Sequence, residues 1–110
     1  MDTVAIVDVI KGNPTPWPRL ESDDYIMTTG STKPLEDAFR IAHTQMVHWV
    51  SELTGQSVLD AYQFVSQTAL TPVANVVDTN YTGSNTATLS IRDTALSSSG
   101  SNCARRKARR

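Results

Sequence analysis

The feature that most constrains the fold of this chain is an apolar stripe within residues 34–54. Its members recur at spacings of three and four residues: Leu35, Ala38, Phe39, Ala42, Met46, Trp49, Val50 and Leu53. That spacing places all of them on one face of an α-helix. A helix with one apolar face must pack against another element, so the rest of the chain has to supply a matching surface.

The ends of this helix are also marked in the sequence. Glu36 and Asp37 stand near its start, where acidic side chains complement the positive end of the helix dipole. Ser31 or Thr32 is expected to supply the N-cap oxygen. Gly55 is expected to end the helix, because glycine readily adopts the left-handed conformation of a C-cap.

A second helix is predicted to begin at Ser57 and to continue to about Gln67. The segment SVLD resembles a capping box in which Asp60 replaces the usual glutamate. The apolar side chains of this helix include Val58, Leu59, Tyr62, Phe64 and Val65. The short connection between the two helices predicts a helical hairpin.

Strand-forming composition flanks the helices. VAIVDVI, residues 4–10, and YIMTTG, residues 25–30, are predicted strands, the second ended by Gly30. Three prolines in the intervening residues exclude helix and predict an extended loop. Val73, Val76 and Val77 favour a further strand, and Pro72 places its start at a sheet edge or a bulge. The residues thus predict a small α+β unit.

The sequence changes character after Thr82. Residues 83–110 are rich in Ser, Thr and Asn and are expected to form a tail, separate from a folded unit over residues 1–82, with disorder that begins at about residue 83 or 95. Half of the basic residues lie at the very end: Arg105, Arg106, Lys107, Arg109 and Arg110. No aromatic residue interrupts this run, which argues against a dedicated nucleic-acid site.

Length and composition set further limits. The 110 residues form one domain at most. No run approaches the ~20 apolar residues of a membrane span, and the acidic opening MDTVAIVDVI is not that of a signal peptide. The single cysteine, Cys103, excludes an internal disulfide framework and fits the reducing cytoplasm.

Three carboxylates form the first candidate site. Glu21, Asp23 and Asp24 precede the predicted strand at residue 25. In an extended segment Glu21 and Asp23 point to the same face, and two close acids can divide acid and base roles. The alternative is a solvated turn in which Ser22 and the acids make local hydrogen bonds.

Other chemical groups are weakly marked. His43 and His48 are five residues apart, so they cannot share a metal as an i, i+4 pair on a helix can. His43 borders the apolar stripe, which indicates a histidine at the edge of the core. No nucleophile elbow and no glycine-rich phosphate loop is present.

Five stretches in order carry a family resemblance: VDVIKG, PWPRLESDDYIMTTGS, PLEDAFRIA, LDAYQFVSQ and PVANVVDTNYT. Together they make residues 4–82 closely similar to the C-terminal part of the acetamidase/formamidase family, and PVANVVDTNYT leans toward formamidases. The resemblance implies a cytoplasmic, homo-oligomeric hydrolase that cleaves the C–N bond of short aliphatic amides to ammonia and a carboxylate.

The resemblance also implies a site and a fold. Glu21, Asp23 and Asp24 become candidate catalytic residues, and Asn75 and Asp78 become candidate substrate-binding residues on a second wall of the same site. A divalent metal is conceivable in the full-length family, but its identity is unknown. The implied fold is a partial β-sandwich-like unit with a helical hairpin, the incomplete C-terminal part of a larger domain.

The departures from the family pattern set the functional expectation. The chain lacks the upstream segment, rich in glycine and acids and holding a histidine, that is expected to supply most catalytic groups. After residue 82 the family continues with a Val- and Lys-bearing strand, whereas this chain continues with an unmatched sequence rich in Ser and Arg. This abrupt change resembles a frameshift or a chimeric end. We therefore expect an amidase fragment that is inactive alone. The alternative is a small non-catalytic binding or interaction module with a basic tail.

Overall fold

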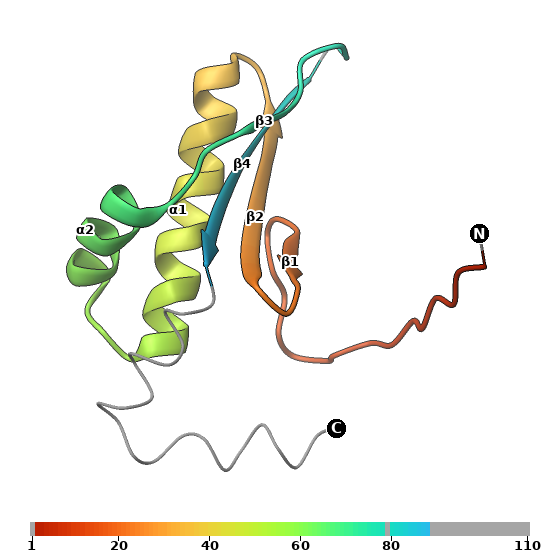
Figure 1. The fold of residues 1–110 in the computed structure, drawn as a ribbon, viewed down its shortest axis with the longest axis horizontal. Helices are drawn as coiled ribbons and strands as arrows, with labels where there is room; N and C mark the ends of the chain where they lie inside the picture. Colours follow the sequence, from red (N-terminus) through yellow and green to blue (C-terminus); the bar gives the residue numbers. More distant parts are fainter. Residues whose placement is uncertain (1, 79, 89–110) are drawn as a thin grey trace.

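The computed structural model describes residues 2–78 and 80–88 as one helical layer packed on a four-stranded antiparallel sheet (Figure 1). In chain order the elements are β1 (Arg19–Glu21), β2 (Tyr25–Thr32), α1 (Leu35–Thr54), α2 (Val58–Thr68), β3 (Val73–Asn75) and β4 (Tyr81–Thr88). The predicted α+β class and the helical hairpin are confirmed. Neither helix in the described part of the chain is long and apolar enough to cross a membrane.

The sheet is built around one long strand pair. The strand order is β1-β2-β4-β3, so the last strand of the described chain lies in the interior of the sheet. β2 and β4 pair along their whole length, from Tyr25 opposite Thr88 to Thr32 opposite Tyr81. The two outer strands are only three residues long, and β3 carries an irregularity between Val73 and Asn75. Pro72 stands just before the edge strand β3, as predicted.

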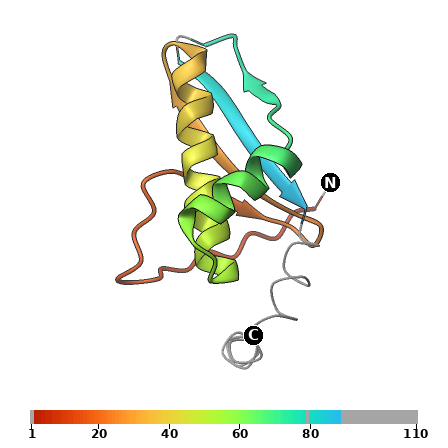
Figure 2. The same ribbon diagram turned by 90° about the vertical axis from the view of Figure 1, so that its left-hand side faces the viewer.

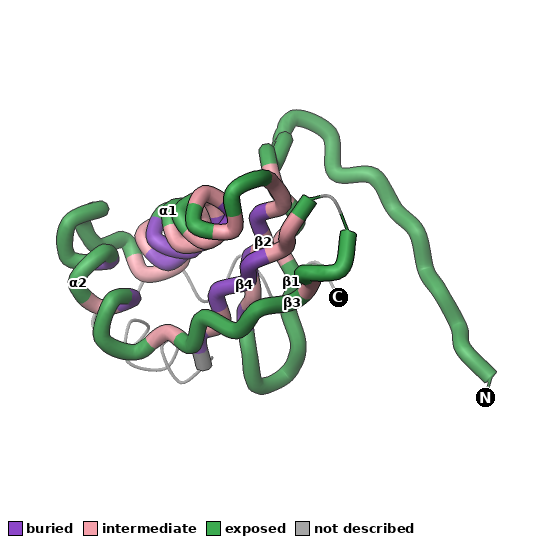
Figure 3. Tube along the Cα trace, turned by 90° about the horizontal axis from the view of Figure 1, so that it is seen from above, coloured by how far each residue is buried: buried purple, intermediate pink, exposed green. Residues whose placement is uncertain are grey.

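Helix α1 covers one face of this sheet (Figures 2 and 3). Alternate residues of β2 face the helix and are buried: Ile26, Thr28 and Gly30. The core joins these to the predicted apolar stripe of α1, and Met46 and Val50 are fully buried within it. Thr28 adds a polar contact, because its hydroxyl donates to the Ala42 carbonyl oxygen at 2.7 Å.

The start of α1 differs from the prediction. Ser31 and Thr32 belong to β2, and neither caps the helix. The N-cap residue is Pro34, which provides no side-chain hydrogen bond. Its carbonyl oxygen instead accepts from the backbone N–H groups of Asp37 and Ala38. The pairing of β2 with β4 continues through both hydroxyl residues, and this pairing outweighs their capping tendency.

Two paired glycines let α1 approach the sheet closely. Gly30 of β2 lies opposite Gly83 of β4. A Cβ atom on Gly30 would stand 2.4 Å from the backbone oxygen of Ala38, and one on Gly83 would stand 2.8 Å from Cδ1 of Phe39. The prediction that Gly30 ends its strand is therefore wrong. Gly30 lies inside the strand because the helix leaves no room there for a side chain.

The second helix follows its prediction closely. Ser57 is the N-cap, and its side chain accepts from the Asp60 backbone N–H at 3.2 Å. The Ser57 hydroxyl also donates to Asp60 Oδ2 at 2.6 Å. The Asp60 carboxylate thus binds the hydroxyl, whereas in a full capping box it would accept from the Ser57 backbone N–H. Gly55 ends α1 in the left-handed conformation, with φ of 73°. Ala61 and Val65 of α2 then complete the buried core.

An ion pair fastens the short edge strand β1 to the helix layer. Arg19 donates to both carboxylate oxygens of Glu52 on α1, at 2.7 and 3.2 Å. Its guanidinium also lies 5.2 Å from the centre of the Trp49 ring. Because Arg19 hydrogen-bonds the carboxylate, the pKa of Glu52 is lowered from its ordinary value. The contact holds β1 against the C-terminal half of α1.

The prediction that the folded unit ends at residue 82 is wrong, because the sheet continues beyond it. Residues 83–88 complete β4, and Gly83, Asn85 and Ala87 are buried against α1. Small and polar side chains fill these inward positions, so the strand carries no apolar signal in the sequence. The predicted disorder of the remaining tail, including the basic end and Cys103, concerns residues 89–110, which lie outside the described residues.

The strand predicted at residues 4–10 does not form. This segment is extended but joins no sheet, and its one hydrogen bond within the described chain is local, from the Val9 N–H to Asp8 Oδ1. We call residues 4–10 the arm. Its large apolar side chains are 71–91% exposed: Val4, Ile6, Val7, Val9 and Ile10. Valine and isoleucine favour a strand only where a partner strand is at hand.

The glycine pair generates a stability prediction. Gly30→Ala is expected to lower the free energy of unfolding by about 3 kcal/mol, because the added methyl meets backbone rather than a movable side chain. Gly83→Ala is expected to cost less, since its Cβ would come no nearer than 2.8 Å to Phe39, against 2.4 Å from backbone at Gly30. Chemical denaturation measures both. Thr29→Ala, on the opposite face of β2, is the control, and an equal loss in that variant would contradict the close-approach explanation.

Candidate functional site

The acidic candidates lie at the turn between β1 and β2. Glu21 ends β1, while Asp23 and Asp24 occupy the exposed turn itself. Ser22 organises this turn: its N–H donates to the Tyr25 carbonyl oxygen at 2.8 Å, and its hydroxyl accepts from the Tyr25 N–H at 3.0 Å. The geometry is that of the solvated turn described above, and Asp23 and Asp24 are exposed like ordinary surface acids.

The second pair of candidates forms a small polar cluster of its own. Asn75 Nδ2 donates to Asp78 Oδ2 at 2.7 Å, and Asn75 Oδ1 accepts from the Val77 N–H at 3.0 Å. Both hydrogen bonds span three residues or fewer. They shape the turn that follows β3, and Asp78 is exposed there. The structure thus brings Asn75 and Asp78 together in a turn rather than in a cavity.

The two sets of candidates lie at opposite ends of the sheet. Glu21 is opposite Ile26 of β2, whereas Asn75 connects through Thr82 of β4 to Ser31 of β2. Ile26 and Ser31 are five residues apart on β2, which corresponds to about 17 Å along the strand. An amide as small as formamide or acetamide cannot contact both sets at once. As arranged here, they do not form two walls of one small-molecule site.

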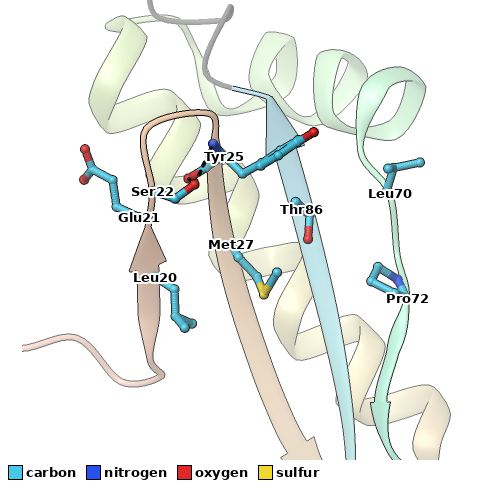
Figure 4. Close-up of a pocket in the computed structure, with 8 residues that line it drawn as sticks. All are labelled: Leu20, Glu21, Ser22, Tyr25, Met27, Leu70, Pro72 and Thr86. Atoms are coloured by element: carbon cyan, nitrogen blue, oxygen red, sulfur yellow. Dashed lines mark hydrogen bonds between the residues drawn. The ribbon is translucent and has the colours of Figure 1, made fainter. Parts of the chain in front are cut away.

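A shallow apolar depression lies on the face of the sheet that α1 does not cover (Figure 4). Its volume is about 540 Å³, and its lining comes from β1, β2, β4 and the segment before β3: Leu20, Glu21, Ser22, Tyr25, Met27, Leu70, Pro72 and Thr86. The Glu21 carboxylate points outward from it. Thr86 Oγ1 is buried and has no hydrogen-bond partner among the described residues.

A histidine cluster occupies the other side of the sheet. Nδ1 of His43 on α1 lies 2.8 Å from Nδ2 of Asn85 on β4. With the Asn85 amide as donor, Nδ1 accepts and the ring proton sits on Nε2. The Tyr62 ring of α2 packs edge-on against the imidazole at a centroid distance of 5.9 Å. Burial lowers the pKa of His43 below its ordinary value of 6.5.

This cluster borders a second open depression of about 610 Å³, lined by Phe39, Arg40, His43, Thr44, Tyr62 and Thr71. It offers a neutral imidazole and a few hydroxyl groups. Its guanidinium is already engaged, because Arg40 pairs with Glu36 and Asp37 on its own helix. The arrangement resembles a satisfied histidine at the core boundary, as predicted, more than acid–base machinery. Asn85 Oδ1 remains without a hydrogen-bond partner in the described chain.

Asn85 was missed by the sequence analysis because it falls in the segment assigned to the tail. One signal was present. Gly83, Asn85 and Ala87 are small residues at alternate positions, the period of a strand face lying close to a helix. No group of three or more His, Cys, Asp or Glu side chains within residues 2–78 and 80–88 is placed to hold a metal ion.

Solved structures give the decisive comparison. An acetamidase from Yersinia enterocolitica matches 76% of this chain with 36% sequence identity and a TM-score of 0.72. The chain belongs to the acetamidase/formamidase family. An acetamidase from Bacillus halodurans shares the fold over 73% of the chain, with a TM-score of 0.67 and 24% identity.

The match to the family is partial in length. The chain spans about a quarter of the acetamidases: 25% of the Yersinia chain and 27% of the Bacillus chain. A comparison with models of protein families gives no match, and neither does a comparison with curated proteins. The family resemblance found in the five sequence stretches is thus confirmed by structure, while the nearer relation to formamidases stays a prediction.

The His43 environment generates a prediction about pH. The folded chain resists protonation of His43, whereas the unfolded chain takes up the proton at about pH 6.5. The unfolded state then binds more protons, so stability falls as the pH drops below 6.5 and is unaffected by this group above it. Urea titrations between pH 5 and 8 measure the slope.

His43→Gln is expected to reduce that slope, because it removes the group that titrates differently in the two states. The matched control is His48→Gln, which alters an exposed histidine on the same helix. A wild-type slope in the His43→Gln variant would contradict the assignment.

Proposed function

We propose that this chain forms part of an amide hydrolase that cleaves the C–N bond of short aliphatic amides, giving ammonia and a carboxylate. The observation that carries the proposal is the 36% identity, over three quarters of the chain, to an acetamidase. Formamide is the favoured substrate because PVANVVDTNYT leans toward formamidases. A cytoplasmic location belongs to the proposal, since a single cysteine suits a reducing compartment.

The described residues alone lack a complete set of catalytic groups for this reaction. Amide hydrolysis needs an activated nucleophile, a polarised carbonyl and a proton donor for the leaving nitrogen. His43 is half-buried and bonded to Asn85, and the acidic turn lies on the surface. We therefore propose that the described region contributes one wall of the active site and supports the remainder.

A chimera tests this function directly. The quarter of the Yersinia acetamidase that this chain matches is replaced by the corresponding residues of this chain, and ammonia release from formamide and acetamide is measured. We expect the chimera to hydrolyse both, and formamide faster. The 110-residue chain by itself is expected to release no ammonia above buffer.

Two results would overturn the proposal. A chimera that is folded, as judged by a cooperative melt, but inactive toward both amides would exclude the amidase role. Clear turnover by the purified 110-residue chain would show that its active site is complete, contrary to the proposed division of catalytic groups.

Among the acidic candidates, Glu21 is the one to test first, because it belongs to the lining of the apolar depression, although its carboxylate points outward in Figure 4. We expect Glu21→Gln in the chimera to lower kcat at least about 100-fold, the usual contribution of a general acid or base. Glu36→Gln is the matched control, since it alters an exposed acid at the start of α1. An unchanged kcat in the Glu21→Gln chimera would remove the acidic turn from the site.

A further inference from the structure

A buried amide and a histidine ring join β4 to α1. Nδ2 of Asn85 lies 2.8 Å from Nδ1 of His43, and the asparagine is 0% exposed. Oδ1 of the same amide is buried and has no hydrogen-bond partner among the described residues. Buried amide oxygens are nearly always paired, because leaving one unpaired costs free energy. A spare acceptor therefore lies on the same small group that already donates to the ring.

The Nδ1 atom of a histidine has two opposite roles in hydrogen bonding. In the neutral ring with its proton on Nε2, Nδ1 accepts a hydrogen bond, whereas in the protonated ring both nitrogens donate. The asparagine amide carries a donor and an acceptor at equivalent positions of one planar group. Half a rotation of this group exchanges Nδ2 for Oδ1 beside the ring and leaves the backbone in place. Asn85 is thus able to hydrogen-bond His43 in either protonation state.

The other groups around His43 do not substitute for this amide. The depression beside the ring holds two further titratable groups, Tyr62 of α2 and Arg40 of α1. Tyr62 packs edge-on against the imidazole, and Arg40 already pairs with Glu36 and Asp37. The sheet presents only uncharged buried residues to α1: Ile26, Thr28 and Gly30 on β2, and Gly83, Asn85 and Ala87 on β4. The pKa of His43 is accordingly lowered by burial.

The amide nitrogen also has a nearby acceptor when it turns away from the ring. Thr28 of β2 lies directly opposite Asn85 of β4, and both residues face α1. Side chains at opposite positions of an antiparallel pair stand about 4.5–5.5 Å apart at their Cβ atoms. The Thr28 hydroxyl donates to the Ala42 carbonyl oxygen, so its own oxygen keeps its lone pairs for a donor. Turning the amide therefore does not leave Nδ2 in wholly apolar surroundings.

We propose that His43 and Asn85 form a proton-sensitive switch: Nδ2 donates to the neutral ring, and the amide turns over so that Oδ1 accepts from Nδ1–H when the ring is protonated. The step adds one proton from solvent to Nδ1, through the open depression that His43 borders. No other bond forms or breaks except the hydrogen bonds of the amide. The histidine thereby changes its charge while α1 stays bonded to β4. The switch does not depend on the proposed amidase reaction.

Nitrogen-15 NMR of the full 110-residue chain tests the switch without any substitution. At pH 8 we expect the His43 proton on Nε2 and a scalar coupling across the hydrogen bond from Asn85 Nδ2 to Nδ1. As the pH is lowered, the side-chain amide resonances of Asn85 are expected to shift with the same midpoint as the His43 ring. An Nδ1–H resonance protected from exchange with water is expected to appear in that transition. His48, exposed on the same helix, is the control and is expected to show no protected ring proton.

Two substitutions at Asn85 separate its acceptor from its donor. Asn85→Leu removes both, so the proton affinity of His43 is expected to fall at least about tenfold, because a hydrogen bond to a charged ring is lost. Stability then continues to fall to a lower pH than in the wild type, since the folded chain resists the proton further. Asn85→Asp offers only an acceptor once ionised, and the proton affinity is expected to rise above that of the wild type. Thr86→Val, the next position of β4 on the opposite face, is the control and is expected to leave the affinity unchanged.

Four results would overturn the switch. They are a His43 proton on Nδ1 at pH 8, which would make Oδ1 the permanent acceptor; an Nδ1–H that exchanges as fast as that of His48; unfolding of the chain before the ring is protonated; and an unchanged proton affinity in both Asn85 variants. If a variant does not fold, the wild-type NMR titration decides alone. None of these measurements involves ammonia release, so the switch and the proposed function fail separately.

Discussion

The close approach of α1 to the paired glycines Gly30 and Gly83 is the contact on which the rest of this structure depends. It sets the distance between the helical layer and the two central strands. At that distance Thr28 reaches the Ala42 carbonyl oxygen, and Asn85 reaches His43. A helix held farther from the sheet would lose both polar contacts and would leave a gap where packing is now dense. These two small residues thus set the spacing between the helical layer and the sheet.

The sequence was informative where structure is decided locally. Both helices were predicted, together with the end of α1 and the start of α2, because their apolar period, the Gly55 stop and the Ser57 cap depend on residues close in the chain. Pairing between distant strands was not predictable in this way. The arm has strand composition but no strand partner, whereas β4 has loop composition and two partners. Burial of Gly83, Asn85 and Ala87 follows from what lies across from them, and their own side chains do not reveal it.

The candidate site shows the same division between local and distant effects. The hydrogen bonds of Ser22 and of Asn75 are short in sequence, and the turns that they form were within reach of sequence reasoning. The separation of these turns is a property of the sheet register and became visible only in the structure. The family resemblance assigned both turns to one site because it compares positions along the chain. A substrate, in contrast, can contact only residues that lie close together in the folded protein.

The interior position of β4 has a consequence for how the chain folds. β2 pairs with β1 on one edge through a tight turn, but its other edge waits for a strand that follows both helices in the chain. As the polypeptide leaves the ribosome, that edge of β2 therefore stays open while α1 and α2 are made. An open edge invites pairing with other chains, and closing a loop of this length carries an entropic cost. α1 packs on β2 and α2 packs on α1, so the two helices bring the chain back beside the place that β4 will take. In cotranslational folding, α1 and α2 thus act as a template on which the last strand completes the sheet.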